Sequence, residues 1–256
     1  MIVVTGGAGF IGSNVVAALA AKGDREVVIC DVFGNNDKWK NVGKHELAGV
    51  VSPSDLIDFL NSKSSRMEAI IHLGAVTDTT ETDVDLILHN NFKFSLMLWD
   101  WCALNKAAFI YASSAATYGD GSQGFGDSDS ASVLSRLRPL NPYGWSEHLF
   151  DRRVARIIAG QLPAPEKWAG LKFFNVFGPN EYHKGRMSSV ALQVYKSILA
   201  GEPVKLFRSH NPDYKDGGQM RDFIYVEDCV SAIEWILAED EVTGLYNLGT
   251  GEARSF

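Results

Sequence analysis

Three glycines near the beginning of the chain could hold a phosphate group. Gly6, Gly9 and Gly12 recur at every third position between an apolar run, Met1–Val4, and a run with helical spacing of its apolar residues, Ile11–Lys22. A buried strand that turns through glycines into a helix presents bare backbone N–H groups to the pyrophosphate of a dinucleotide. The pattern therefore predicts a dinucleotide site; glycines that only form a tight turn are the alternative.

An acidic residue at the end of the next apolar run supports this interpretation. Asp31 follows Val27–Cys30 and stands about twenty residues beyond Gly12, where a carboxylate accepts hydrogen bonds from the adenosine ribose. Asp31 alone favours NAD, because it repels a 2′-phosphate. Lys38, in the polar loop that follows, could neutralise that phosphate and favours NADP instead. An ordinary polar loop is the alternative for Lys38, and NADP is favoured over NAD.

Three further side chains could transfer a proton. Ser114 follows the apolar run Ala107–Ala112, at the carboxyl end of a predicted strand, where open α/β sheets bind ligands. Tyr143 opens a predicted helix, and Glu147 lies one turn later on the same face. A tyrosine hydroxyl can act as acid or base, and a serine hydroxyl can stabilise an alkoxide. A tyrosine that is simply buried at a helix start is the alternative.

Alternating strand and helix patterns position these residues. The alternation predicts an α/β fold, a doubly wound parallel sheet of the Rossmann type with a small C-terminal substrate lobe. We expect a dinucleotide-binding domain over 1–175 and a substrate lobe over 176–256, interleaved near 222–250 and cut short at its end. Strands are predicted at Met1–Val4, Val27–Cys30, Ala69–Leu73, Ala107–Ala112, Leu171–Phe174, Val204–Phe207, Asp222–Val226 and Leu245–Leu248. Helices are predicted at Ile11–Lys22, Ser54–Asn61, Asn90–Asn105, Pro142–Ile158, Met187–Leu199 and Val226–Ala238.

Composition narrows the class of protein. The 256 residues carry a net charge of −7 and no run of Lys or Arg longer than two, which disfavours nucleic acid and anionic membranes as partners. The three cysteines are far apart in apolar stretches and match no metal or disulfide spacing. With no leader and no apolar run of about 20 residues, we expect a soluble, cytoplasmic protein with no metal.

Taken together, the glycine loop, Ser114 and Tyr143 resemble the extended short-chain dehydrogenase/reductase family. His72–Ala75, Phe174–Pro179 and Arg221–Val226 match further segments of that family. The resemblance implies that the cofactor contacts Gly6, Gly9, Phe10, Ile11, Gly12, Asp31, Lys38, His72, Gly74, Ala75, Asn91 and Asn175.

Within that family, Ala112–Gly119 and Glu181–Gly185 are similar to the ADP-L-glycero-D-manno-heptose 6-epimerases. Related dehydratases carry an Asp-Glu pair where this chain has Ala115 and Ala116, and UDP-galactose 4-epimerases lack the His-Lys-Gly segment. The resemblance implies epimerisation of an ADP-heptose at C6 through a 6-keto intermediate with tightly bound NADP. That activity would supply the heptose for lipopolysaccharide core biosynthesis. The resemblance also implies a homo-oligomer, namely a homopentamer. Another nucleotide-sugar 4-epimerase or reductase, or a non-catalytic dinucleotide-binding protein, is the alternative.

The same resemblance assigns roles within the site. It implies that Tyr143 and Lys184 are paired acid/base groups, one for each epimer, although which residue serves which epimer stays open. Ser114 would hydrogen-bond the alkoxide, and substrate contacts would come from Ser114, Asn175, His183 and Arg221. A solvated loop lysine is the alternative for Lys184, and a structural or substrate-orienting role is expected for His183.

One position departs from the family pattern. The family carries a lysine four residues after the tyrosine, where this chain has Glu147. A free tyrosine, with a pKa of ~10, is only about one part in a thousand phenolate at pH 7. A nearby cation lowers that pKa, whereas an anion raises it. We therefore hypothesise that Glu147 impairs this chain.

Overall fold

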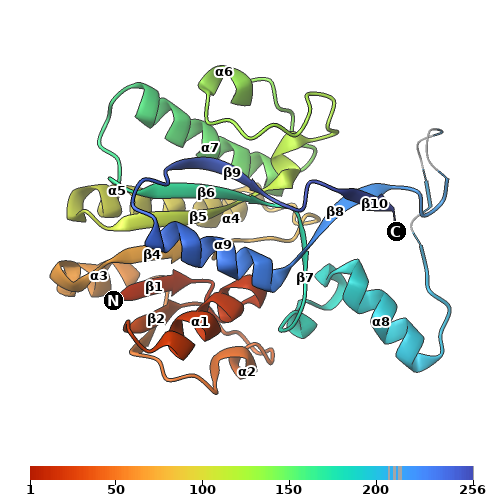
Figure 1. Ribbon diagram of the computed structural model, residues 1–256, viewed down its shortest axis with the longest axis horizontal. Coiled ribbons are helices and arrows are strands. Elements are labelled where there is room, and N and C mark those ends of the chain that lie inside the picture. Colours follow the sequence, from red (N-terminus) through yellow and green to blue (C-terminus); the bar gives the residue numbers. More distant parts are fainter. Residues whose placement is uncertain (207, 210–211, 213–214, 256) are drawn as a thin grey trace.

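A seven-stranded parallel sheet forms the centre of the molecule (Figure 1). The computed structural model describes residues 1–206, 208–209, 212 and 215–255. The strand order is β3-β2-β1-β4-β5-β6-β9, which reverses direction between β1 and β4. The fold is thus the predicted Rossmann-type doubly wound sheet. Its strands are β1 (Ile2–Thr5), β2 (Val27–Cys30), β3 (Gly49–Val51), β4 (Ala69–His72), β5 (Ala108–Ser114), β6 (Trp168–Phe173) and β9 (Gly244–Leu248).

Helices cover both faces of the sheet because the strands are apolar on both sides. In β1, Val3 packs against one face, with α3 (Leu56–Ser62), α5 (Phe94–Asn105) and α7 (Pro142–Ala159). Its neighbours Ile2 and Val4 pack against the opposite face, with α1 (Phe10–Lys22) and α9 (Val226–Ala238). This alternation follows from the period of two in an extended strand. The shorter helices are α2 (Trp39–Val42), α4 (Val84–Ile87) and α6 (Ala131–Leu134).

A smaller sheet lies beside the carboxyl end of β6. It contains β7 (Asn175–Phe177), β8 (Met220–Tyr225) and β10 (Ala253–Ser255), with β7 parallel and β10 antiparallel to β8. The helix α8 (Val190–Ala200) stands next to it, on the right in Figure 1. The chain then returns through α9 to pair β9 with β6, so the segment from β7 to β8 is inserted within the main sheet's sequence.

Some predicted elements differ from the observed ones. No strand forms over Val204–Leu206, and Phe207 lies outside the described residues. The helix predicted at Asn90–Asn105 begins earlier, as α4 and a π-helical segment, Leu88–Lys93, that continue into α5. The short strands β3 and β10 were not predicted, because three residues are too few to show a period. The strand β7 lies within Phe174–Pro179, where the family resemblance alone implied a strand. Within the described ranges, no helix is long and apolar enough to cross a membrane.

Candidate active site

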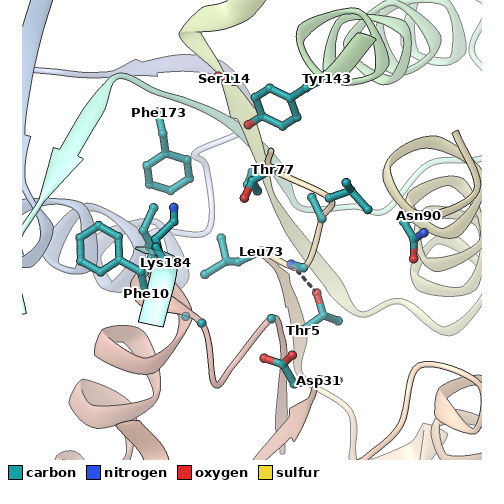
Figure 2. Close-up of a pocket in the computed structure, with 18 of the residues that line it drawn as sticks. Thr5, Phe10, Asp31, Leu73, Thr77, Asn90, Ser114, Tyr143, Phe173 and Lys184 are labelled. Atoms are coloured by element: carbon teal, nitrogen blue, oxygen red, sulfur yellow. Dashed lines mark hydrogen bonds between the residues drawn. The ribbon is translucent and has the colours of Figure 1, made fainter. Parts of the chain in front are cut away.

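A cavity of about 630 Å³ opens at the carboxyl ends of the strands, where the strand order reverses. Its walls come from the glycine loop after β1, the ends of β2, β5 and β6, the loop after β4 and the start of α7 (Figure 2). Open α/β sheets bind their ligands at this position, because the loops diverge there. The predicted site residues in its wall are Gly6, Gly9, Phe10, Ile11, Gly12, Asp31, Lys38, Gly74, Ala75, Ser114, Tyr143, Glu147, Asn175, His183 and Lys184.

The glycine loop packs so tightly against the start of α1 that Gly12 has no room for a side chain. Gly6 has a φ of +64°, and a Cβ added to Gly12 would stand 2.2 Å from the carbonyl oxygen of Gly6. No side chain caps the N-terminus of α1 at Gly9, so its first N–H groups face the cavity without a side-chain acceptor. An anion is stable at such a helix end. The loop therefore fits the pyrophosphate of a dinucleotide.

Asp31 and Lys38 form an ion pair at one end of the cavity. The Lys38 ammonium donates to Asp31 Oδ1 at 2.6 Å, and the Ala8 N–H donates to Asp31 Oδ2 at 2.8 Å. Both side chains are mostly buried. One oxygen of the carboxylate thus fixes the glycine loop, while the other is neutralised by a cation.

Tyr143 points into the cavity beside Ser114 (Figure 2). Tyr143 lies in the first turn of α7, whose N-terminus is stabilised in two ways. Asn141 Oδ1 accepts a hydrogen bond from the Gly144 N–H at 2.7 Å, and Pro142 occupies the first turn. Burial raises the pKa of the Tyr143 hydroxyl, and the Glu147 carboxyl raises that pKa further. A hydrogen bond with Ser114 lowers the same pKa, by a smaller effect.

Glu147 is 6 % exposed and lines the cavity one turn after Tyr143. Burial raises the pKa of its carboxyl well above the usual value, and the nearby Asp151 raises it further, against an opposing effect of Lys172. The Glu147 carboxyl thus keeps its proton to higher pH than an exposed one. The side chain one turn after Tyr143 is thus a carboxyl group and not a cation.

A buried ion pair lies behind this wall and was not predicted. Lys172 of β6, 1 % exposed, donates to Asp151 Oδ2 of α7 and to Thr117 Oγ1, each at 2.7 Å. Asp151 also accepts hydrogen bonds from Ser113 at 2.8 Å and from Tyr111 at 3.2 Å. The pair ties α7 to β5 and β6. A lysine in an otherwise apolar strand was the available signal.

Lys184 belongs to the opposite side of the cavity. Figure 2 shows its ammonium group and the Tyr143 hydroxyl pointing into the same space. The ammonium lies 5.8 Å from the centre of the Phe10 ring, and burial lowers its pKa. A lysine whose pKa is lowered gives up its proton more readily than a free lysine does. The structure therefore places Lys184 in the cavity wall and not in solvent.

Two predicted cofactor residues do not line the cavity. The His72 ring is buried, with Nδ1 2.6 Å from Thr5 Oγ1 and Nε2 2.8 Å from Ser95 Oγ. Asn91 hydrogen-bonds the backbone of Val76 at both its N–H and its carbonyl. Both residues thus support the loop after β4, whose Gly74 N–H donates to Thr5 in Figure 2.

A second cavity of about 540 Å³ adjoins the first and shares Phe10, Asn175 and Lys184 with it. The predicted substrate residue Arg221 lines this second cavity. Arg186 and Arg208 line it too and were not predicted, since isolated arginines in loops carry no pattern. Arginines favour phosphate groups. Among the described residues, no group of three or more His, Cys, Asp or Glu side chains could hold a metal ion.

Comparison with known proteins bears on this geometry. Residues 2–249 match the model of the NAD dependent epimerase/dehydratase family. A Fusobacterium nucleatum protein named ADP-L-glycero-D-manno-heptose-6-epimerase is 45 % identical over 258 residues, which cover all of this chain and 76 % of that protein. The Helicobacter pylori ADP-L-glycero-D-manno-heptose-6-epimerase structure superposes with a TM-score of 0.78 at 30 % identity, over 99 % of this chain and 78 % of that one. A Thermus thermophilus UDP-glucose 4-epimerase in complex with NAD superposes with a TM-score of 0.74 at 28 % identity, over 99 % and 79 %.

Proposed function

This chain belongs to the NAD dependent epimerase/dehydratase family, and from that premise we propose that it interconverts the two C6 epimers of ADP-glycero-D-manno-heptose. One observation carries the proposal: Tyr143 and Lys184 line a single cavity that also contains the glycine loop. The 45 % identity to a protein named as the heptose 6-epimerase supports the choice of sugar.

Two proton-transfer groups suit this reaction. A carbinol carbon has no acidic proton, so inversion passes through a planar ketone at C6. When bound, the nicotinamide supplies the acceptor and the donor for the hydride that leaves and returns at that carbon. The C6 hydroxyl stands on different sides of the two epimers. Tyr143 and Lys184 can therefore each hold the hydroxyl proton of one epimer, while Ser114 donates a hydrogen bond to the developing alkoxide.

The cofactor is a nicotinamide dinucleotide, and we propose that it is NADP. Lys38 already neutralises Asp31 at 2.6 Å, so the carboxylate no longer repels a 2′-phosphate strongly. The same ammonium can turn toward that phosphate. In this proposal, residues 1–175 hold the cofactor and residues 176–256 hold the sugar nucleotide, with the arginines of the second cavity next to its phosphates.

The test follows epimerisation of ADP-D-glycero-D-manno-heptose at C6 by NMR in the presence of NADP. We expect the chain itself to turn over slowly, because Glu147 leaves Tyr143 without a cation. Glu147→Lys should raise the rate on the order of 10²-fold, since a positioned cation favours the phenolate. Glu147→Gln is the matched control, which removes the carboxyl without adding a charge and should stay slow.

Each result of this test points to one interpretation. Full turnover by the unmodified chain would retain the proposed function and contradict the impairment by Glu147. C4 epimerisation of UDP-glucose, with no change of ADP-heptose in any variant, would favour the 4-epimerase alternative. Tight NADP binding with no turnover of either sugar, even in Glu147→Lys, would indicate a non-catalytic binding protein.

A further inference from the structure

A buried polar side chain joins two loops that reach the cavity from different parts of the sequence. Asn41 lies in α2 and is 1 % exposed. Its Nδ2 donates to the carbonyl oxygen of Ala8 in the glycine loop at 2.9 Å. Its Oδ1 accepts a hydrogen bond from the Tyr182 hydroxyl at 2.5 Å. A single amide thus holds the glycine loop on one side and the segment before Lys184 on the other.

The first of these loops belongs to the ribose end of the site. The Ala8 N–H donates to Asp31, and Asp31 accepts from Lys38, so the glycine loop and the start of α2 share one hydrogen-bonded ring with Asn41. The Asn41 N–H closes this ring by donating to the Lys38 carbonyl at 3.0 Å. A change in the position of Lys38 therefore reaches Asn41 through the backbone of one helical turn.

The second loop contains Lys184. Tyr182 and His183 directly precede it, and Asn41 Nδ2 lies 3.4 Å from His183 Nδ1 and 3.3 Å from the Asn180 carbonyl. Glu181 is buried and accepts hydrogen bonds from Ser189, which fixes the other side of the same loop. Asn180 Nδ2 and the Pro179 carbonyl also hydrogen-bond Ser13 and Asn14 of α1. Of these contacts, those of Asn41 are the ones that lead back to Lys38.

We propose that Asn41 is a positioning residue that couples the ribose end of the cofactor site to Lys184. The inference rests on the proposed function only for the role of Lys184 in proton transfer. A ligand that moves Lys38 or Asp31 changes the hydrogen bonds of Asn41, and Asn41 passes that change to Tyr182 and its neighbours. The two loops are distant in sequence, and the Asn41 amide contacts both and is bonded through its own backbone to Lys38.

The experiment measures the rate at which Lys184 in the purified full chain is modified by an amine-reactive label, detected by peptide mass spectrometry. The probes are adenosine 2′,5′-bisphosphate and AMP, which occupy the ribose end and lack the nicotinamide half. We expect the preferred probe to change the Lys184 labelling rate about fivefold, within the usual range of coupling between sites. Tyr182→Phe removes the hydrogen bond of Asn41 Oδ1 to the Lys184 loop and keeps the longer contacts of Nδ2. It should therefore reduce this change clearly while the probe binds with unaltered affinity.

Two further variants sharpen the result. Asn41→Ala should lose the coupling and also weaken probe binding, because it loses the Ala8 contact as well. Adding Tyr182→Phe to it should cause no further loss of coupling. Lys44→Ala, an exposed change just after α2, is the matched control and should behave as the unmodified chain. If Asn41→Ala does not fold, Tyr182→Phe alone decides.

The labelling does not require turnover, so its outcome is separate from that of the proposed function. Unaltered Lys184 labelling when the probe saturates the unmodified chain would overturn the proposal. Retention of the full change in Tyr182→Phe would overturn it too. If ADP-heptose proves to be a substrate, Tyr182→Phe should lower kcat several-fold and leave the KM for the sugar nearly constant. If the Asn41–Tyr182 contact were purely structural, Tyr182→Phe would leave both kcat and the effect of the probe on Lys184 labelling unchanged.

Discussion

Among single residues, Glu147 shows how burial changes the chemistry of a carboxyl group. It lines the cavity with Tyr143, and Asp151 and Lys172 lie within electrostatic range of it. Burial raises the pKa of both Glu147 and Tyr143, so both groups keep their protons over a wide range of pH. Proton release from this wall therefore depends on what else enters the cavity, and Lys184 is the cation that already faces it.

The pH dependence of stability tests the state of Glu147. In the unfolded chain its pKa is near the ordinary value for Glu, whereas the folded pKa is higher, so the folded state binds the extra proton between the two values. The free energy of unfolding therefore falls as the pH rises through that window, with a slope of at most about 1.4 kcal/mol per pH unit. Glu147→Gln lacks this loss. Its free energy of unfolding relative to that of the unmodified chain should therefore be larger at pH 8 than at pH 5, as measured by urea unfolding.

A matched substitution isolates the effect. Asp151, Lys172 and Tyr143 are present in both chains, which differ only at residue 147. Glu241→Gln changes an exposed carboxyl and should show the same pH dependence as the unmodified chain. A constant difference between Glu147→Gln and the unmodified chain across this pH range would mean that Glu147 is ionised in the folded state like an exposed glutamate.

At the scale of elements, the ion pair between Lys172 and Asp151 fixes α7 against β5 and β6. Lys172→Met should reduce the free energy of unfolding by about 3–5 kcal/mol, because it leaves a buried carboxylate without its cation. The double variant Lys172→Met with Asp151→Leu should recover most of that loss, since neither charge remains. Urea unfolding of the single and double variants measures the coupling.

An exposed ion pair provides the comparison. Lys22 pairs with Glu234 at 3.0 Å, but the lysine is half exposed, so Lys22→Met should cost about 1 kcal/mol or less. A loss for Lys172→Met no larger than that for Lys22→Met would show that water or a rearranged neighbour already satisfies Asp151.

The predictability of these elements depended on their length. The apolar run Val27–Cys30 was predicted to the residue because polar residues flank it on both sides. The helix α7 was predicted nearly to the residue because Asn141 and Pro142 mark its start. The short strand β3 has too few residues to show a period. The strand predicted at Val204–Phe207 was wrong over Val204–Leu206, which pairs with none of the strands in the described part of the chain.

The site shows the same division between local and long-range information. Gly6 and Asp31 were predicted because the spacing that identifies them lies within one βαβ unit. Asn41 was not, because its partner Tyr182 is 141 residues away in sequence. The roles expected for His72 and Asn91 came from resemblance alone, and the structure places both behind the cavity wall. Contacts between distant segments are set by the fold, which a local pattern does not describe.

At the scale of the whole molecule, the net charge and the charge of the cavities have opposite signs. The chain carries a net charge of −7, yet Lys38, Lys184, Arg186, Arg208 and Arg221 line the two adjoining cavities. We expect the local cations to decide the association of an anionic nucleotide, because a concave wall focuses their field. The association rate of adenosine 2′,5′-bisphosphate should therefore fall several-fold between about 0.01 M and 0.15 M salt, as screening shortens the range of attraction.

Stopped-flow tryptophan fluorescence measures this rate. Adenosine, which has no phosphate, is the control ligand and should show little dependence on salt. A rate that rises with salt would mean that the negative charge of the whole molecule repels the nucleotide more strongly than the cavities attract it.

The position of β9 also has a consequence for folding of the chain during translation. It pairs with β6 in the main sheet, although β7, α8, β8 and α9 all come between them along the chain. During translation, β6 therefore leaves the ribosome long before β9. The edge of β6 that pairs with β9 stays without a partner strand while the intervening segment is translated. Such an edge invites pairing with other nascent chains. A chaperone that shields Trp168–Phe173 during this interval would protect the dinucleotide-binding half until translation reaches β9.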